Sequence, residues 1–378
     1  MNGVTGRMGY RQHLVRSVLP IRDQGGLTLD DGSVLRVEPV LVGRDEAKLR
    51  DLAEQHDIAE WTTDLDKVMA DESIEVYFDS QVTSRRPDAV RAAIAAGKHV
   101  YAEKPSAERL ADALDLARIA AAAGTTTGVV HDKLYLPGLV KLRRLVEDGF
   151  FGRILSLRGE FGYWVFEGHD QPAQRPSWNY RAEDGGGITV DMFAHWNYVL
   201  EAILGPVRSV YANAVTHIDE RWDEHQQRYS ATADDAAFAV FEVDGGAIAQ
   251  INSSWAVRVH RDELVEFQVD GVAGSAVAGL HHCVVQDRAA TPRPVWDPDV
   301  ATDLDFRAGW TPVEPDATYG NAFRVQWEEF LADLAAGRPH RHDLLSAARG
   351  VQLAELGLRS SAQGVKVVVP ELTQETRP

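Results

Sequence analysis

Glycines with a regular spacing open the chain, and the chemistry they suit is phosphate binding. They stand at Gly3, Gly6 and Gly9, and helix-like sequence follows from Tyr10 to Val18. Glycines permit a tight turn and let backbone N–H groups approach a pyrophosphate at a helix N-terminus. The alternative is a plain loop, because a lone glycine pattern often arises by chance. The candidate cofactor contacts in this turn are Gly3, Thr5, Gly6, Arg7, Met8 and Gly9.

Three ionisable side chains form a second candidate for chemistry. Lys104 directly precedes a proline, and Asp191 and His195 stand four residues apart, so that on a helix they share one face. An imidazole can accept a proton near neutral pH, and an ammonium group can donate a hydrogen bond to a reacting oxygen. The alternative is a surface lysine beside a helix-surface contact worth about a few tenths of a kcal/mol.

The first half of the chain predicts the elements that would position these residues. Short apolar runs alternate with helix-like segments, two of which are followed by the stop signals Gly97 and Gly124. This alternation predicts right-handed βαβ units and a parallel sheet, in which ligands bind beyond the carboxyl ends of the strands. Strands are expected at Val40–Val42, Ile74–Phe78, His99–Ala102 and Thr127–Val130, and helices at Asp45–His56, Pro87–Ala96 and Ala107–Ala123.

Two features interrupt this α/β pattern. The segment Ile21–Pro39 predicts a β-hairpin insertion with its turn at Asp31-Gly32. Only Met1 and Asn2 precede the glycine turn, where a dinucleotide fold has its first strand. We therefore expect that first strand to be missing, with a loss of sheet hydrogen bonds and of phosphate-site geometry. One interpretation is a native chain that starts upstream of Met1.

The residues after the second expected strand bear on the choice of cofactor. Dinucleotide folds often place an acid there, on the ribose 2′-hydroxyl. This chain instead has Gly43 followed by Arg44. A small residue and a guanidinium suit a 2′-phosphate, which gives NADP a slight preference over NAD. The alternative is a surface ion pair of Arg44 with Asp45 or Glu46.

The second half predicts an α+β domain with a largely antiparallel open sheet. Strand-like alternation covers Arg153–Phe161, and Ala236–Val243 and Ala247–Trp255 predict a hairpin. Helices are expected at Val325–Ala335 and Leu344–Ala362. We divide the chain into residues 1–130, which bind the dinucleotide, and 131–378, which bind the substrate and other subunits. An exposed sheet face could pair subunits, so we expect a homodimer or homotetramer.

Composition narrows the class of protein further. Lys and Arg total 39 and Asp and Glu total 57, so the formal net charge is −18. Such a chain repels phosphate backbones and anionic membranes, which disfavours nucleic-acid and membrane partners. No signal peptide or membrane span is recognisable, so the cytoplasm is the expected compartment. With a single cysteine and poorly spaced histidines, we expect no metal site.

Several motifs coincide in one order along the chain. Gly97–Pro105 is GKHVYAEKP, and Gly185–His195 is GGGITVDMFAH. The C-terminal segment from Gln326 to Gly364 adds two further helices. In these motifs the chain resembles the Gfo/Idh/MocA oxidoreductases, and the resemblance covers nearly the whole sequence. The run Lys133–Gly138 is similar to that of a subset of sugar and glycoside dehydrogenases within this family.

The resemblance implies a Rossmann domain, an α+β domain and hydride transfer between NAD(P) and a hydroxyl or ketone of a sugar, glycoside or cyclitol. It assigns Lys104 to polarise the oxygen, His195 to act as acid and base, and Asp191 to orient the imidazole or hold a substrate hydroxyl. It also implies cofactor contacts from Gln81, Glu103 and Lys104. Sugars stack on aromatic rings and bond to polar side chains, which favours Lys133, Trp178 and Asn179 beside Asp191 and His195. Weaker candidates for the same pocket are His131, Asp132, Trp164, His169 and Tyr180.

The sequence departs from the family pattern beside the cofactor. Gln81-Val82 replaces a usual Thr-Pro, and Arg86 stands where a histidine is usual. The glycine spacing also differs and is similar to that of dihydrodipicolinate reductases. These departures leave a second interpretation open, namely a catalytically inactive NAD(P)-binding homologue with a regulatory or structural role.

Overall fold

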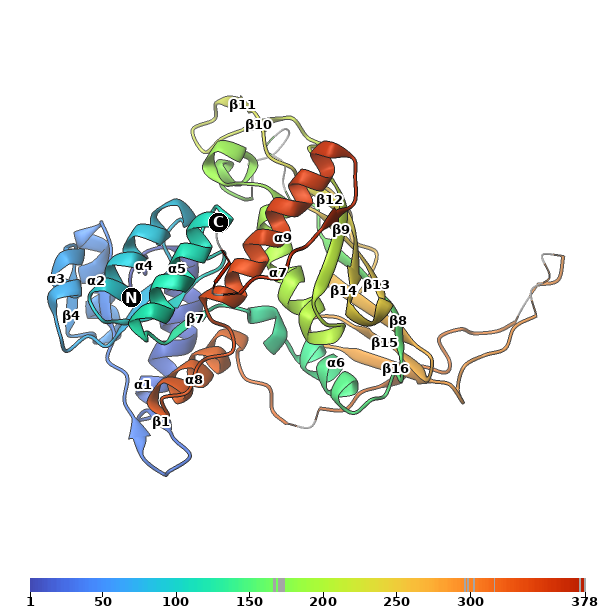
Figure 1. Ribbon diagram of the computed structural model, residues 1–378, viewed down its shortest axis with the longest axis horizontal. Helices are drawn as coiled ribbons and strands as arrows, with labels where there is room; N and C mark the ends of the chain where they lie inside the picture. The colour runs from blue at the N-terminus through green and yellow to red at the C-terminus, as the bar shows by residue number, and fades with distance from the viewer. Residues whose placement is uncertain are drawn as a thin grey trace.

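The computed structural model describes residues 1–378 except 166–167, 169–173, 296, 298, 302, 316, 374 and 377–378. Parallel strands and their helices form one side of the molecule, and a large sheet forms the other (Figure 1). The parallel strands are β3 (Val40–Val42), β4 (Glu60–Thr62), β5 (Val76–Asp79), β6 (His99–Ala102) and β7 (Thr127–Val129). Their helices are η1 (Gly9–Val18), α1 (Leu19–Asp23), α2 (Glu46–His56), α3 (Leu65–Ala70), α4 (Arg86–Ala95) and α5 (Leu110–Ala123).

Asn2 occupies the place of the first strand, which we expected to be missing from the parallel sheet. It forms parallel bridges to Val42 of β3 and to Asp79 of β5, and so joins two pieces of the sheet. Asn2 N–H donates to Phe78 O (2.8 Å), and Ser80 N–H donates to Asn2 O (3.0 Å). The backbone hydrogen bonds that a first strand would make between β3 and β5 are therefore present at Asn2, although no regular strand is formed.

The hairpin insertion forms as expected. Strands β1 (Leu27–Thr28) and β2 (Val34–Leu35) pair antiparallel, and the Asp31 carboxylate accepts the Ser33 N–H in the turn. The helix that follows the glycine turn differs from the expectation in type, because η1 is a π-helix rather than an α-helix. Helices of this type are rare in proteins, and those that occur often lie at functional sites.

The second domain is built on a nine-stranded sheet in the order β17-β16-β15-β14-β8-β13-β12-β9-β18. Every neighbouring pair is antiparallel except β13 with β8, so the expected character is confirmed. Its strands are β8 (Ile154–Gly162), β9 (Val207–Val215), β12 (Ala236–Val243), β13 (Ile248–Ser254), β14 (Val265–Gly271), β15 (Gly274–Ala278), β16 (Cys283–Asp287), β17 (Thr311–Pro312) and β18 (Val367–Val368). A separate small hairpin joins β10 (Glu220–Trp222) and β11 (Arg228–Ser230).

Helices cover one face of this sheet and close the junction between the domains. They are α6 (Pro137–Glu147), α7 (Ile188–Ile203), α8 (Ala322–Ala335) and α9 (Leu344–Gln363), with short 3₁₀ turns at η2 (Thr83–Arg85), η3 (Asp132–Tyr135), η4 (Ser177–Tyr180), η5 (Ala182–Asp184) and η6 (Asp244–Gly246). The apolar face of α7 packs on β12 and β13 through Phe193 and Trp196. Helix α9 runs between the two domains (Figure 1) and adds Leu344 to the core of the first.

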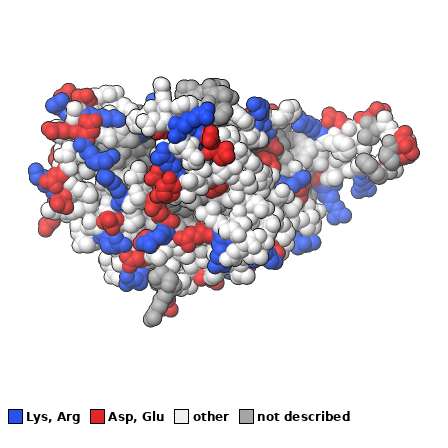
Figure 2. Space-filling view, turned by 90° about the horizontal axis from the view of Figure 1, so that it is seen from above, with Lys and Arg blue, Asp and Glu red and all other residues white. Residues whose placement is uncertain are grey.

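The chain returns to its first domain through α8. Trp327 and Phe330 of α8 pack against Phe78 and Tyr101 of the parallel sheet. The segment between β16 and β17 projects from the edge of the large sheet (Figure 1). Acidic and basic side chains are intermingled on the face shown in Figure 2.

Candidate active site

The glycine turn lies at the carboxyl end of the parallel strands. Gly3 adopts φ +81°, and a Cβ atom there would lie 2.7 Å from the backbone of Ser80. A Cβ atom at Gly9 would lie 2.4 Å from the Ser80 Oγ. These two glycines therefore let the turn pack directly against the end of β5. Within the described residues, no side chain caps the start of η1, so its first N–H groups suit a pyrophosphate.

The residues after β3 adjoin the same turn. A Cβ atom at Gly43 would lie 3.3 Å from the Thr5 methyl group. Lys48, which belongs to no motif of the sequence, donates from Nζ to Thr5 O (2.7 Å). Arg44 is exposed and, within the described chain, has neither an ion pair nor a side-chain hydrogen bond. Asp45 instead caps α2 through the Lys48 N–H, so the alternative surface pair with Arg44 is not formed.

The loop after β5 is held by a buried ion pair. Arg86 Nε lies 3.0 Å from Asp79 Oδ1, and both side chains are almost completely buried. The same guanidinium donates to Gln81 O (2.7 Å) and to Pro105 O. Gln81 folds back, and its Nε2 donates to Asp79 Oδ2 (2.8 Å). Arg86 thus ties the Gln81 loop to the segment that carries Lys104.

Glu103 anchors that segment from the interior. Trp327 Nε1 donates to His13 Nδ1 (2.9 Å), so the proton of a neutral His13 is on Nε2, which donates to Glu103 Oε1 (2.8 Å). Glu103 Oε2 accepts the Lys104 N–H (3.2 Å). Burial raises the pKa of Glu103, but the His13 hydrogen bond and the nearby charges, including Lys104, outweigh it and lower the pKa below its usual range.

Lys104 and Asp191 form the first contact across the domains. Lys104 Nζ lies 2.5 Å from Asp191 Oδ1 and also donates to Asp191 O (3.2 Å). Arg175 lies 3.6 Å from the other carboxylate oxygen. Burial favours the neutral carboxyl, but the charges of Lys104 and Arg175 prevail and lower the pKa of Asp191 to about 2. Asp191 is therefore a carboxylate at neutral pH.

His195 belongs to a second group, one turn further along α7. Lys133 Nζ lies 3.3 Å from His195 Nε2, and the Tyr198 hydroxyl lies 2.5 Å from Nδ1. Asp132 Oδ1 lies 3.7 Å from the same Nδ1. Burial, reinforced by the charges of Lys104 and Lys133, lowers the pKa of His195 well below its usual range. The imidazole is therefore neutral at physiological pH.

The expectation that Asp191 orients the imidazole is not met by the geometry. Asp191 and His195 share the α7 helix, yet no hydrogen bond joins them among the described residues, because Asp191 turns to Lys104 and Arg175. Tyr198 and Asp132 contact the imidazole instead. Asp132 was a weak sequence candidate, and Tyr198 was missed, although its i,i+3 spacing from His195 was a usable signal.

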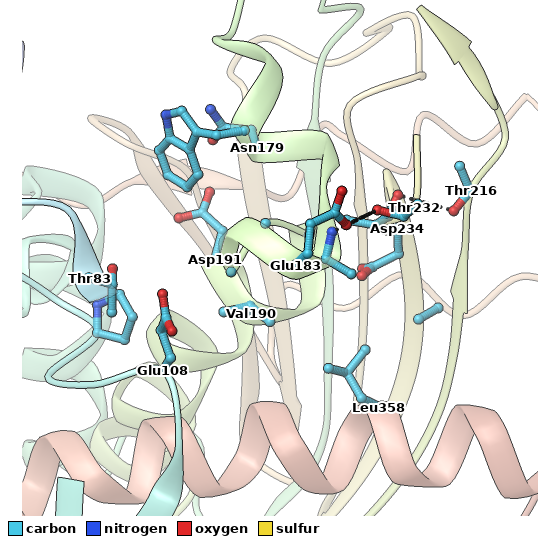
Figure 3. Close-up of a pocket in the computed structure, with 18 of the residues that line it drawn as sticks. Thr83, Glu108, Asn179, Glu183, Val190, Asp191, Thr216, Thr232, Asp234 and Leu358 are labelled. Atoms are coloured by element: carbon cyan, nitrogen blue, oxygen red, sulfur yellow. Dashed lines mark hydrogen bonds between the residues drawn. The ribbon is translucent and has the colours of Figure 1, made fainter. Parts of the chain in front are cut away.

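The cavity that borders Asp191 has a volume of about 570 Å³ and reaches from the parallel domain into the second. Trp178, which is 45% exposed, and Asn179 both line this cavity. In Figure 3, Asp191 faces the side of the cavity formed by Thr83 and Glu108, and Glu183, Thr232 and Asp234 lie at the other end. The lining thus combines an aromatic ring with carboxylates, hydroxyls and an amide, which suits a polyhydroxylated ligand.

The weaker pocket candidates divide into three groups. His131 is buried against Tyr198, and Tyr180 is buried beneath the guanidinium of Arg221. Trp164 lies against Arg258. His169 lies outside the described residues. Neither a metal-binding group of three His, Cys, Asp or Glu side chains nor a helix able to cross a membrane is found in the part of the chain that the structure describes.

Comparisons with known proteins agree with this architecture. Residues 34–131 match the oxidoreductase family with an NAD-binding Rossmann fold, and residues 139–277 match the GFO/IDH/MocA C-terminal domain. A D-xylose dehydrogenase of Paenarthrobacter nicotinovorans is 64% identical over 377 residues, which cover 99% of this chain and 97% of that protein.

Solved structures share the fold at lower identity. A levoglucosan dehydrogenase in complex with NADH and levoglucosan superposes with a TM-score of 0.81 at 19% identity, covering 98% of each chain. An aldose-aldose oxidoreductase from Caulobacter crescentus gives a TM-score of 0.74 at 18% identity, covering 97% of this chain and 98% of the other. From its sequence and its fold together, the chain belongs to the Gfo/Idh/MocA family of NAD-binding oxidoreductases.

Proposed function

We propose that this chain is an NAD(P)-dependent sugar dehydrogenase that transfers a hydride between the nicotinamide and a CH–OH carbon. The proposal rests on two contacts with helix α7. Lys104, which follows β6, contacts Asp191, and Lys133, which follows β7, contacts His195. These groups lie at the carboxyl ends of parallel strands, where such folds bind ligands. In this proposal residues 1–130 hold the cofactor, and residues 131–378 hold the substrate and the subunit contacts.

The residues of the chain divide the proton chemistry among them. Lys104 Nζ donates a hydrogen bond to the reacting oxygen and so lowers the pKa of the hydroxyl, while Asp191 holds the ammonium group in place. The neutral His195 accepts the hydroxyl proton from the substrate and returns it in the reverse reaction. Lys133 lies beside the imidazole and suits a neighbouring substrate hydroxyl. A bound nicotinamide supplies the hydride acceptor.

The proposed substrate class is an aldose, with D-xylose as the first candidate. Support comes from the identity of 64% with a D-xylose dehydrogenase over nearly the full length of both proteins. It also comes from Trp178 and Asn179, which offer a ring face and an amide beside Asp191. The pocket is large enough for a pentose, and glycosides and cyclitols are the next candidates after aldoses.

The cofactor site is proposed to accept NADP as well as NAD, with a slight preference for NADP. Arg44 carries this preference, because its guanidinium is exposed and free of protein partners within the described residues. Arg44→Ala is expected to weaken NADPH binding about tenfold or more, since hydrogen bonds to charged groups contribute about 1.5–3 kcal/mol. NADH binding should change little. An equal loss for both nucleotides in a fluorescence titration would remove Arg44 from the discrimination.

The experiment that tests the function is a two-part assay of the purified chain. NADH and NADPH binding is measured first by fluorescence titration. Oxidation of D-xylose, other aldoses, glycosides and cyclitols is then followed by the absorbance of the reduced nicotinamide. Sugar-dependent turnover supports the proposal. Tight nucleotide binding without turnover on any of these substrates would overturn it in favour of an inactive NAD(P)-binding homologue.

A further inference from the structure

Two side chains form a connected chain behind the proposed base His195. The Tyr198 hydroxyl lies 2.5 Å from His195 Nδ1 and 3.3 Å from Asp132 Oδ1. Tyr198 follows His195 by three residues on α7, so both side chains project from one face of the helix. Asp132 comes from η3, directly after β7 of the other domain. The chain therefore lies where the second domain begins, next to the end of β7.

The donors around His195 fix where its proton resides. Lys133 Nζ, 3.3 Å from Nε2, is a donor only, so this contact requires a lone pair on Nε2. A neutral imidazole with its lone pair on Nε2 carries its hydrogen on Nδ1. That Nδ1–H then donates to the Tyr198 oxygen. The Tyr198 hydroxyl consequently turns its own hydrogen towards Asp132, which accepts it as a carboxylate.

The surroundings hold this arrangement rigidly. The Tyr198 ring stacks on His131, with centroids 4.2 Å apart and an interplanar angle of 22°. The His131 backbone N–H donates to the Gln326 side chain of α8 (2.6 Å). Burial and the nearby charge of Asp132 raise the pKa of Tyr198 well above its usual range, so its hydroxyl keeps its hydrogen. The groups that face the imidazole are thus the cations Lys104, Lys133 and Arg175, the neutral ring of His131 and the carboxylate of Asp132.

We propose that Tyr198 and Asp132 are positioning residues that hold His195 in the Nδ1–H tautomer and thereby present Nε2 as the proton acceptor of the reaction. Nε2 takes the substrate proton once Lys133 has turned its hydrogen bond from Nε2 to the neighbouring substrate hydroxyl. The imidazolium then keeps its Nδ1–H bond to Tyr198, and the Asp132 charge stabilises it through the hydroxyl. No proton leaves Tyr198 in this scheme. The catalytic consequence rests on the proposed function, whereas the tautomer does not.

The tautomer is tested first, by nuclear magnetic resonance of ¹⁵N-histidine-labelled protein with His195→Asn used to assign the signal. The wild-type chain is expected to show a protonated Nδ1 and an unprotonated Nε2 at His195. Tyr198→Phe removes the acceptor of Nδ1–H and is expected to shift the population towards the Nε2–H form. A wild-type Nε2–H tautomer, or no change in Tyr198→Phe, would overturn the proposal whatever the chain turns over.

Kinetics test the positioning role separately. Tyr198→Phe and Asp132→Asn are each expected to lower kcat about tenfold or more, with far smaller changes in the sugar KM and in NADH affinity. The double variant should lose little more than either single one, because the two groups act as one unit. Tyr101→Phe is the matched control, since this buried hydroxyl has no hydrogen-bond partner among the described residues.

The outcomes separate this proposal from the proposed function. Unchanged kcat in Tyr198→Phe and Asp132→Asn, alongside a strong loss in His195→Asn, would overturn the positioning role and leave the function intact. Full activity of His195→Asn would instead overturn the assignment of His195 as the base. The tautomer measurement would still show whether Tyr198 and Asp132 hold the Nδ1–H form. Should Tyr198→Phe fail to fold by circular dichroism, the tautomer of the wild-type chain and the kinetics of Asp132→Asn still decide the proposal.

Discussion

Lys104 illustrates how one side chain depends on contacts from both domains. Its backbone N–H is held by Glu103, and its ammonium group is held by the carboxylate and the carbonyl oxygen of Asp191. The ammonium group is thereby fixed before any substrate binds, which is the condition for effective electrostatic stabilisation of a developing alkoxide. The sequence identified both residues through their motifs, but it could not show that they form an ion pair.

Replacing Lys104 by Met is the direct test of this role. Lys104→Met is expected to lower kcat on the order of 10²-fold or more, the usual loss when a preorganised donor to a developing oxyanion is removed. Folding should survive, because Arg175 remains beside the Asp191 carboxylate. The melting temperature and kcat are measured together with Lys67→Met, an exposed lysine on α3, as the control. Turnover close to wild type would take Lys104 out of the mechanism.

The loop after β5 shows why the departures from the family pattern are compatible with an ordered site. Arg86 and Asp79 form a buried pair, and the three acceptors of this guanidinium lie on β5, the Gln81 loop and the Pro105 segment. The arginine was recognised in the sequence only as a departure. Its role depends on a carboxylate seven residues away and on a carbonyl of another loop, and neither contact has a local signature.

Removing one partner of this pair should destabilise the protein strongly. Arg86→Met leaves the Asp79 carboxylate buried without its cation, which typically costs about 3–5 kcal/mol in the free energy of unfolding. Arg91→Met is the matched control on the same helix, because Arg91 is 40% exposed in its pairs with Asp88 and Asp115. The control should lose at most about 1 kcal/mol. Urea titrations that give equal losses for the two variants would contradict this account.

Most elements could be predicted where burial imposes a pattern on the sequence. The strands β3, β5, β6 and β7 are short apolar runs, and burial alternates along β13 and along β12 after Ala237. Strand β4 and helix α3 were missed, because Glu60–Thr62 has no fully buried residue and Leu65–Ala70 buries only Val68. Strand β9 was missed because Ser209 and Val210 are both buried, which breaks its alternation. The contact of Tyr198 with Asp132 was beyond the sequence, because it joins side chains that are 66 residues apart in the chain.

At the scale of the whole molecule, the junction between the domains contains several neutral histidines. His131 Nδ1 lies 2.9 Å from His342 Nδ1, and His131 stacks on Tyr198 behind His195. Burial lowers the pKa of His131 to about 3 and lowers the pKa values of His195 and His342 well below the usual range. In the unfolded chain each imidazole titrates near 6.5.

This difference predicts that acid weakens the fold well before the carboxylates titrate. Below pH 6.5 these imidazoles bind protons in the unfolded chain but stay neutral in the folded chain. Their contribution to the free energy of unfolding is therefore complete above pH 6.5 and is lost as the pH falls towards the pKa values of the folded chain. At one pH unit below 6.5, the three histidines together lower the free energy of unfolding by about 4 kcal/mol. Urea unfolding between pH 8 and 5.5 measures it, and His342→Gln should reduce the slope by about a third. A flat profile would contradict neutral burial of these histidines.

The outer face of the nine-stranded sheet is the surface on which the molecule as a whole can associate. Helices α7 and α9 cover the inner face, whereas large apolar side chains stand exposed on the other. They come from four neighbouring strands and are Leu155, Tyr211, Phe238, Val240 and Ile248. Val240 pairs directly with Tyr211 in the register of β12 and β9, so the apolar positions are contiguous. A contiguous apolar face of this kind marks an interaction surface.

We propose that a second copy of this chain covers this face, because the same exposed sheet face on two copies can pair about a two-fold axis. Sedimentation equilibrium is therefore expected to give two or four times the mass of one chain. Val240→Glu places a charge at the centre of the face, where it is solvated in the free chain but buried without a partner in the assembly. This variant should sediment at a lower mass with its melting behaviour largely retained, and Val295→Glu, exposed on the projecting segment, is the control. A wild-type chain that sediments as a monomer would refute the pairing, and an unchanged mass for Val240→Glu would place the contact on another surface.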